Sequence, residues 1–250
     1  MSVTGVDGCA RGWVAVTLRL VGSAADGAER PQSTVPSSED EPATAAPCPA
    51  TALAVSVAVA ATLGELPLAG VTGIDMPLGL LDTGWRDVDQ LARRALGRRW
   101  PTVFAIPPRP VWECGTHADA SRLCRRLTGK GLSIQAWGLR RKIAEADQFR
   151  RAATADVRLY EVHPELSFAS MAGAPLPDSK HTRAGLTVRR ELLAGEGITL
   201  PPGIAGAAVD DLLDAAAVAW SARRIADGRA VVLTSPSQRA DDGTEIAIRY

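Results

Sequence analysis

The chain has 250 residues, 46% of them hydrophobic and 22% charged, which is typical of a globular protein with one good core. It has no run of the roughly 18 apolar residues that a membrane-spanning helix needs, and no basic start followed by an apolar core as in a secretion signal. Lysine plus arginine number 28, as do aspartate plus glutamate, so the net charge alone neither favours nor excludes nucleic acid. We therefore expect one domain over residues 1–250, a cytoplasmic location and no membrane partner.

The chain opens on two short apolar segments joined by glycines, which predict a β-hairpin over residues 4–18. The first segment carries a single acid, Asp7, beside Gly8. A strand that is buried on both faces normally reads as a continuous apolar run, so a carboxylate within it needs a partner or a metal ion. The alternative is an aspartate that forms the turn beside Gly8.

The next segments predict a flexible insertion and two more strands. Residues 21–50 are rich in alanine, proline, serine and acids and lack apolar periodicity, so we expect a flexible insertion there. Residues 52–60 predict a third strand that runs into a short helix. Residues 70–81 have a pattern similar to that of the first segment. They predict an apolar strand that ends in an acid, Asp75, because Pro77 cannot continue a central strand. Ligands of open α/β sheets bind at the carboxyl edge, where we expect Asp75 to lie.

Residues 82–156 predict a helical, arginine-rich insertion after the fourth strand. The stretch from Arg86 to Tyr160 holds 16 basic and 7 acidic residues, a local excess that would suit a phosphate-bearing partner. Solvated arginine-rich helix faces are the alternative. A proline-rich loop over residues 102–110 would hold Arg109 on a stiff backbone. The predicted helices cover residues 82–99, 118–127 and 133–151.

The last third of the chain adds a core strand and two helices. Residues 158–168 predict a strand that carries Glu161 and stops at Pro164. Lys180 lies on a loop ahead of a helix that begins near Ala184. A later alanine-rich helix opens with acids that cap helices well, which is the structural alternative to a metal role. These acids are Asp210, Asp211 and, one turn in, Asp214. Residues 230–234 and 245–250 have the pattern of strands.

Carboxylates on several core elements, without matching histidines or cysteines, favour hard ions such as Mg²⁺ or Mn²⁺. Two such ions about 4 Å apart can activate water and stabilise a leaving oxygen in phosphodiester hydrolysis. This chemistry requires that the acids cluster in the folded protein.

Seven segments of the chain, in one order, resemble the domain of unknown function 429 family. They are G-V-D-G-C…G-W (5–13), I-D-M-P-L-G-L (74–80), the arginine-rich helix followed by V-F…P-P-R (103–109), 131–147, E-V-H-P-E-L-S-F (161–168), 179–189 and 210–223. Proteins of that family are described as predicted nucleases with an RNase H-like fold. The resemblance implies an α/β fold with a mixed five-stranded sheet in the order 3-2-1-4-5, the first three strands antiparallel, and helices on both faces.

The resemblance also implies a site and its chemistry. Its metal ligands would be Asp7, Asp75 and Asp211, or the neighbours of Asp211, Asp210 and Asp214, with Glu161 as a further candidate. Asp7, Asp75, Glu161 and Asp211 would be the catalytic acids. Its substrate-binding residues would be Arg109, Gln135, Lys142, Glu145 and Lys180. We therefore expect a Mg²⁺- or Mn²⁺-dependent nuclease that acts on DNA or RNA. The alternatives are a hydrolase or transferase of nucleotides or small phosphorylated molecules, and a non-catalytic nucleic-acid-binding protein.

Overall fold

A computed structural model of the chain describes residues 1–20, 53–152 and 156–250. The predicted flexible insertion over residues 21–50 lies outside these ranges. Within them, every helix is too short or too polar to cross a membrane.

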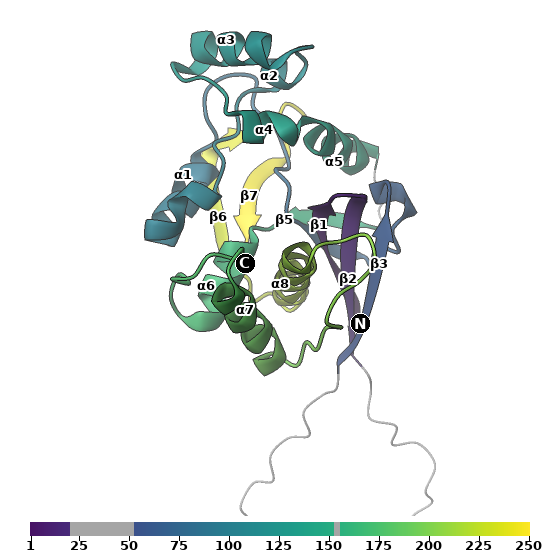
Figure 1. Cartoon of the computed structure of the whole chain (residues 1–250). Helices are drawn as coiled ribbons and strands as arrows, with labels where there is room; N and C mark the ends of the chain where they lie inside the picture. The colour runs from purple at the N-terminus through teal and green to yellow at the C-terminus, as the bar shows by residue number, and fades with distance from the viewer. Residues whose placement is uncertain (21–52, 153–155) are drawn as a thin grey trace, which may run out of the picture.

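A mixed five-stranded sheet organises the molecule (Figure 1). Its strands are β1 (Ser2–Cys9), β2 (Gly12–Leu20), β3 (Leu53–Ala60), β4 (Val71–Ile74) and β5 (Arg158–Glu161). They lie in the order β3-β2-β1-β4-β5; β1, β2 and β3 are antiparallel, while β4 runs parallel to both β1 and β5. The predicted α/β class and sheet order are therefore confirmed.

Helix α8 (Val209–Ala226) packs closely against one face of the sheet, and small residues on both sides allow this. A Cβ atom at Gly5 of β1 would lie 2.0 Å from the backbone nitrogen of Ala219, and one at Gly73 of β4 would lie 2.8 Å from Val218. Glycine at these positions lets the helix axis approach β1 and β4. Helices α6 (Pro164–Ala172) and α7 (Arg183–Gly195) pack against α8 on the same side (Figure 1).

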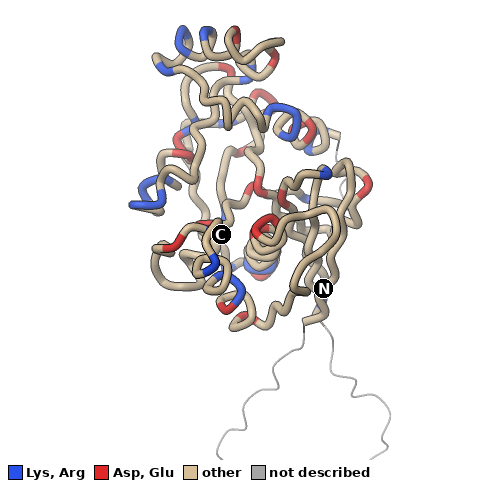
Figure 2. Tube along the Cα trace, viewed as in Figure 1, with Lys and Arg blue, Asp and Glu red and all other residues tan. Residues whose placement is uncertain are grey.

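The opposite face of the sheet is covered by the chain between β4 and β5. Its core brings Val6 and Ile74 of the sheet together with Trp137 and Ile143 of the helices. Figure 2 shows lysines and arginines spread over these helices and acids at the first turn of α8. The elements are α1 (Asp87–Leu96), η2 (Gly97–Thr102), α2 (Arg109–Trp112), α3 (His117–Thr128), α4 (Ile134–Gly138) and α5 (Arg140–Ala152). Leu63 of the short helix η1 (Leu63–Glu65), which lies between β3 and β4, packs into the same core.

Several element boundaries differ from those expected. Helix α1 begins at Asp87 rather than at residue 82, because Gly84 takes a left-handed turn with φ of 72°. The helix expected over residues 133–151 divides at Leu139 into α4 and α5. The strand expected over residues 158–168 ends at Glu161, and Pro164 starts α6, since proline is well suited to the first turn of a helix.

The C-terminal residues form a second, two-stranded sheet rather than an extension of the first. Strands β6 (Val232–Arg239) and β7 (Glu245–Arg249) pair antiparallel with each other. They pack beside α1 and α6 through a small core that includes Leu166, Ile246 and Ile248.

Candidate metal centre

Three carboxylates meet where β1 and β4 end. Asp7 lies near the end of β1, Asp75 directly follows β4, and Asp214 lies in the second turn of α8. One carboxylate oxygen from each lies within 4.8 Å of the others. Asp7 shares the strand face of Gly5, two residues earlier, so the strand face that admits α8 also directs Asp7 toward the helix. We call Asp7, Asp75 and Asp214 the acidic triad.

Burial and mutual repulsion make the triad hold protons strongly. Burial raises the pKa of Asp7 well above its usual range, and the charges of Asp75 and Asp214 raise it further. Burial, followed by the charge of Asp214, raises the pKa of Asp75 to about 8. Burial raises the pKa of Asp214 to about 6, although the Lys180 ammonium opposes this shift. A cation among the three would relieve the repulsion that now favours their protonated forms.

The donor atoms of the triad fit a hard divalent cation. Asp214 accepts a hydrogen bond from Lys180 Nζ at 2.5 Å through Oδ2, whereas its Oδ1 is buried and has no hydrogen-bond partner within residues 1–20, 53–152 and 156–250. A buried carboxylate oxygen without a partner is costly, and a metal ion would satisfy it. All ligand atoms of the triad are carboxylate oxygens, as Mg²⁺ and Mn²⁺ prefer.

The triad lines a cavity of about 590 Å³, a volume in the range of small-ligand sites. The cavity wall carries both apolar side chains, such as Phe104 and Ile106, and basic ones. The cationic residues of the wall are Arg98, Arg99, Lys142 and Lys180, and His163 and His181 line it as well. A ligand in this cavity would therefore lie between the acidic triad and cationic groups that suit phosphate oxygens.

Glu161 also lines the cavity, but its carboxylate is held by other partners. It accepts hydrogen bonds from Arg86 Nη2 at 2.5 Å and from the backbone nitrogen of Leu78 at 2.7 Å. Burial raises the pKa of Glu161 to about 7, and Arg86 opposes that shift. Glu161 is in register with Ile74, so the alternation of the sheet directs it away from the face that Asp75 shares with α8. The structure thus places Glu161 in an ion pair outside the triad.

The other two acids at the start of α8 are also outside the triad. Asp211 is half-buried and its Oδ2 accepts the backbone N–H of Ala208 at 3.3 Å, which caps the helix. Asp210 lies 3.5 Å from Nδ1 of His181. In the described part of the chain, the acidic triad alone brings three potential ligand residues this close together.

Two of the five predicted substrate-binding residues, Lys142 and Lys180, line the cavity. The ammonium of Lys142 donates to the carbonyl oxygens of Gly12 and Cys9 and lies 4.6 Å from the centre of the Trp13 ring. These contacts tie α5 to the turn of the β1–β2 hairpin, beside the triad.

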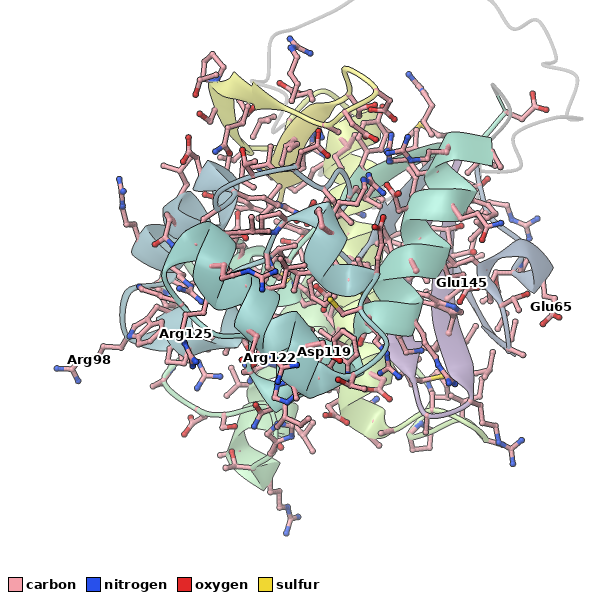
Figure 3. The ribbon with its side chains drawn as sticks, turned by 90° about the horizontal axis from the view of Figure 1, so that it is seen from above. Glu65, Arg98, Asp119, Arg122, Arg125 and Glu145 are labelled. Atoms are coloured by element: carbon pink, nitrogen blue, oxygen red, sulfur yellow. The ribbon has the colours of Figure 1, made fainter. Side chains whose placement is uncertain are left out.

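The other three predicted substrate-binding residues are not among those that line this cavity. Arg109 donates to Asp147 at 2.8 Å, away from the triad. Glu145, labelled on α5 in Figure 3, accepts the Trp13 indole N–H at 3.0 Å and the Leu63 N–H at 2.7 Å. Gln135 is exposed on α4. One oxygen of Glu145 therefore holds α5 against the hairpin, and the other holds it against η1.

Sequence reasoning missed a buried ion pair behind the cavity wall. Arg189 of α7 is fully buried and donates to Glu165 of α6 at 2.6 Å, and Arg99 approaches the same oxygen at 3.4 Å. One signal could have revealed it. Arg189 lies four residues from Gly185 and from Leu193, so it occupies the buried face of the helix, where a charge needs a partner.

Comparisons with known proteins identify the family of the chain but no activity. The profile of the family described as "Protein of unknown function (DUF429)" matches residues 5–239. No curated protein and no solved structure matches the chain.

Proposed function

The chain belongs to the DUF429 family of proteins of unknown function, so we infer its activity from the geometry of the site. We propose that the protein is a divalent-metal-dependent nuclease. The acidic triad at the base of the cavity carries this proposal. An RNase H-like fold, in which acids on the first and fourth strands and on a late helix hold the metal, agrees with the observed sheet order and with the positions of Asp7, Asp75 and Asp214.

The chemistry assigned to the triad is hydrolysis of a phosphodiester. A bound Mg²⁺ or Mn²⁺ would supply an activated water and stabilise the charge that develops on phosphate oxygens. Asp7, Asp75 and Asp214 would hold that ion, and the close packing of α8 on Gly5 sets the position of Asp214 relative to Asp7. In the adjacent wall, Arg86 pairs with both Glu161 and Asp89.

Basic and aromatic side chains at the cavity mouth favour a nucleic acid. Arg98 and Arg99 line the cavity, and Arg98 projects away from the body of the protein (Figure 3). Phe104, just after η2, lines the cavity and is 39% exposed, whereas Trp100 within η2 is 52% exposed and lies outside the cavity lining. Arginines interleaved with exposed aromatic rings suit a phosphate backbone with stackable bases.

Not all of the basic excess between Arg86 and Tyr160 is free to bind phosphates. Arg109, Arg150 and Arg151 all contact Asp147. Arg109 and Arg151 also pair with Asp241. We therefore assign phosphate binding to the cavity mouth rather than to the whole arginine-rich region.

The size of the cavity favours a second candidate on the same centre. Its volume of about 590 Å³ is enough for a single nucleotide or a small phosphorylated molecule. A hydrolase of such compounds would use the triad in the same way and would leave polymers intact.

The test is a cleavage screen with Mg²⁺ or Mn²⁺ on single- and double-stranded DNA and RNA, with nucleotides and phosphate monoesters in parallel. The nuclease requires polymer cleavage that EDTA stops and that Asp7→Asn and Asp214→Asn reduce by at least about 100-fold, as expected when one transition-state contact is lost. Asp210→Asn is the matched control, because Asp210 lies on the same helix end outside the triad.

Turnover of nucleotides alone would replace the nuclease with the second candidate. Binding of nucleic acid without turnover, unaffected by EDTA, would refute both enzymes and favour a non-catalytic binding protein.

A further inference from the structure

Lys180 contributes a positive charge directly to the acidic triad. Its Nζ lies 2.5 Å from Asp214 Oδ2, and its side chain is 29% exposed. Lys180 also lines the same cavity as Asp7, Asp75 and Asp214.

The backbone around Lys180 is fixed by the start of α7. Thr182 Oγ1 donates to the carbonyl of Ser179 at 2.8 Å and accepts the N–H of Gly185 at 3.1 Å. A Cβ atom at Gly185 would lie 2.0 Å from the Ser179 carbonyl oxygen, so only glycine allows this contact. The segment that carries Lys180 is therefore packed onto α7, and the lysine is held at the triad.

The other buried acids of the cavity wall pair with arginines. Glu161 and Asp89 share Arg86, and Glu165 pairs with Arg189. Among the described residues, the three carboxylates of the triad have one close cation, Lys180. When ionised, the triad and Lys180 together carry two net negative charges, which one divalent cation neutralises.

Lys180 also occupies one of the two oxygens of Asp214. The remaining oxygen, Oδ1, is buried and has no hydrogen-bond partner among the described residues, and Asp214 itself lines the cavity. Asp214 therefore offers one free oxygen to a metal ion, whereas bridging two ions about 4 Å apart would require Lys180 to leave.

We propose that the triad binds a single divalent cation and that the ammonium of Lys180 takes the place of a second one. A lysine suits this role because its charge is compact and its three donors have no fixed plane. The inference rests on the metal role of the triad in the proposed function, but not on nuclease activity. In this arrangement Lys180 balances the charge of the centre and helps to orient Asp214.

The test is the stoichiometry of Mn²⁺ binding, measured without nucleic acid by calorimetry and by electron paramagnetic resonance of free Mn²⁺. Wild-type protein is expected to bind one Mn²⁺ per chain. Lys180→Met keeps the length of the side chain but removes its charge, and it is expected to bind two. Lys180→Arg restores the charge and is expected to bind one.

Lys142→Met is the matched control, since Lys142 is the other lysine of the cavity but contacts backbone carbonyls instead of the triad. This variant is expected to bind one Mn²⁺ per chain. Two ions in the wild type, or one in Lys180→Met, would overturn the inference. No Mn²⁺ binding by the wild type would refute the metal centre as well. One ion in the wild type and two in Lys180→Met, with no cleavage of any substrate, would support the inference while refuting the nuclease.

Discussion

Replacing Asp75 with asparagine is expected to stabilise the metal-free protein at alkaline pH. Burial and the charge of Asp214 raise the pKa of Asp75 from the usual 3.8 to about 8. Between these values the folded state binds a proton that the unfolded chain has released, so the free energy of unfolding falls as the pH rises from about 4 to about 8. Asparagine cannot ionise and therefore removes this cost, which is largest above pH 8 and absent below pH 4.

The size of the effect follows from the shift. Each pKa unit corresponds to about 1.4 kcal/mol, and because Asp75 shares its repulsion with two other acids, we expect asparagine to gain about 2 kcal/mol at pH 8. For a protein of this size that gain raises the melting temperature by about 4–8 °C. At pH 5 most of the gain should be lost.

A divalent ion should reverse the order of stability. At 100 times its dissociation constant, Mn²⁺ would stabilise the wild type by about 2.7 kcal/mol, whereas Asp75→Asn lacks one ligand and should gain little. Calorimetric melting at pH 5 and pH 8, with EDTA or with Mn²⁺, measures all four conditions. Asp210→Asn is the control and should keep the response to Mn²⁺.

Two results would refute this reasoning. An Asp75→Asn variant that is less stable than the wild type in EDTA at pH 8 would show that repulsion within the triad does not destabilise the folded protein. An unchanged response of this variant to Mn²⁺ would show that Asp75 is not a ligand.

Two further predictions concern the scaffold of the site, and both are measured by denaturant unfolding. Arg86→Met leaves Glu161 buried without its charge partner and should lower the free energy of unfolding by about 3–5 kcal/mol. Adding Glu161→Gln should recover part of that loss. A double variant no more stable than the single variant would contradict the pairing. Gly5→Ala places a Cβ atom 2.0 Å from the Ala219 backbone nitrogen and should lower the free energy of unfolding by about 1–3 kcal/mol or more. It should also weaken Mn²⁺ binding, because α8 is pushed outward. A variant as stable as the wild type would contradict the close packing of α8.

Local sequence is sufficient to predict the strands and two of the three acids that lie together in the fold. An isolated acid in an apolar strand, or at its end before a proline, is costly unless the fold gives it a partner or a ligand. This pattern alone marks Asp7 and Asp75 as candidates. The sheet order follows from the family resemblance rather than from periodicity, because strand pairing is a long-range property.

The tertiary structure decided which late acids join the site. Asp210, Asp211 and Asp214 all lie in the first two turns of α8, and all are equally good helix-start residues. Only the rotation of α8 on the sheet, set by its contacts with Gly5 and Gly73, turns Asp214 inward and leaves the other two at the rim. The sequence of a helix predicts which residues share a face. It does not predict which face of a buried helix with few polar residues contacts the sheet.

Glu161 illustrates the same limit in a strand. Its sequence context matches that of Asp75, since both are acids at the end of an apolar strand before a proline. Side chains alternate along a strand, so the parallel register that aligns Glu161 with Ile74 rather than with Asp75 directs its carboxylate toward Arg86. Sequence determined where the charges lie along the chain, whereas register and helix rotation, set by packing between distant segments, determined which of them meet.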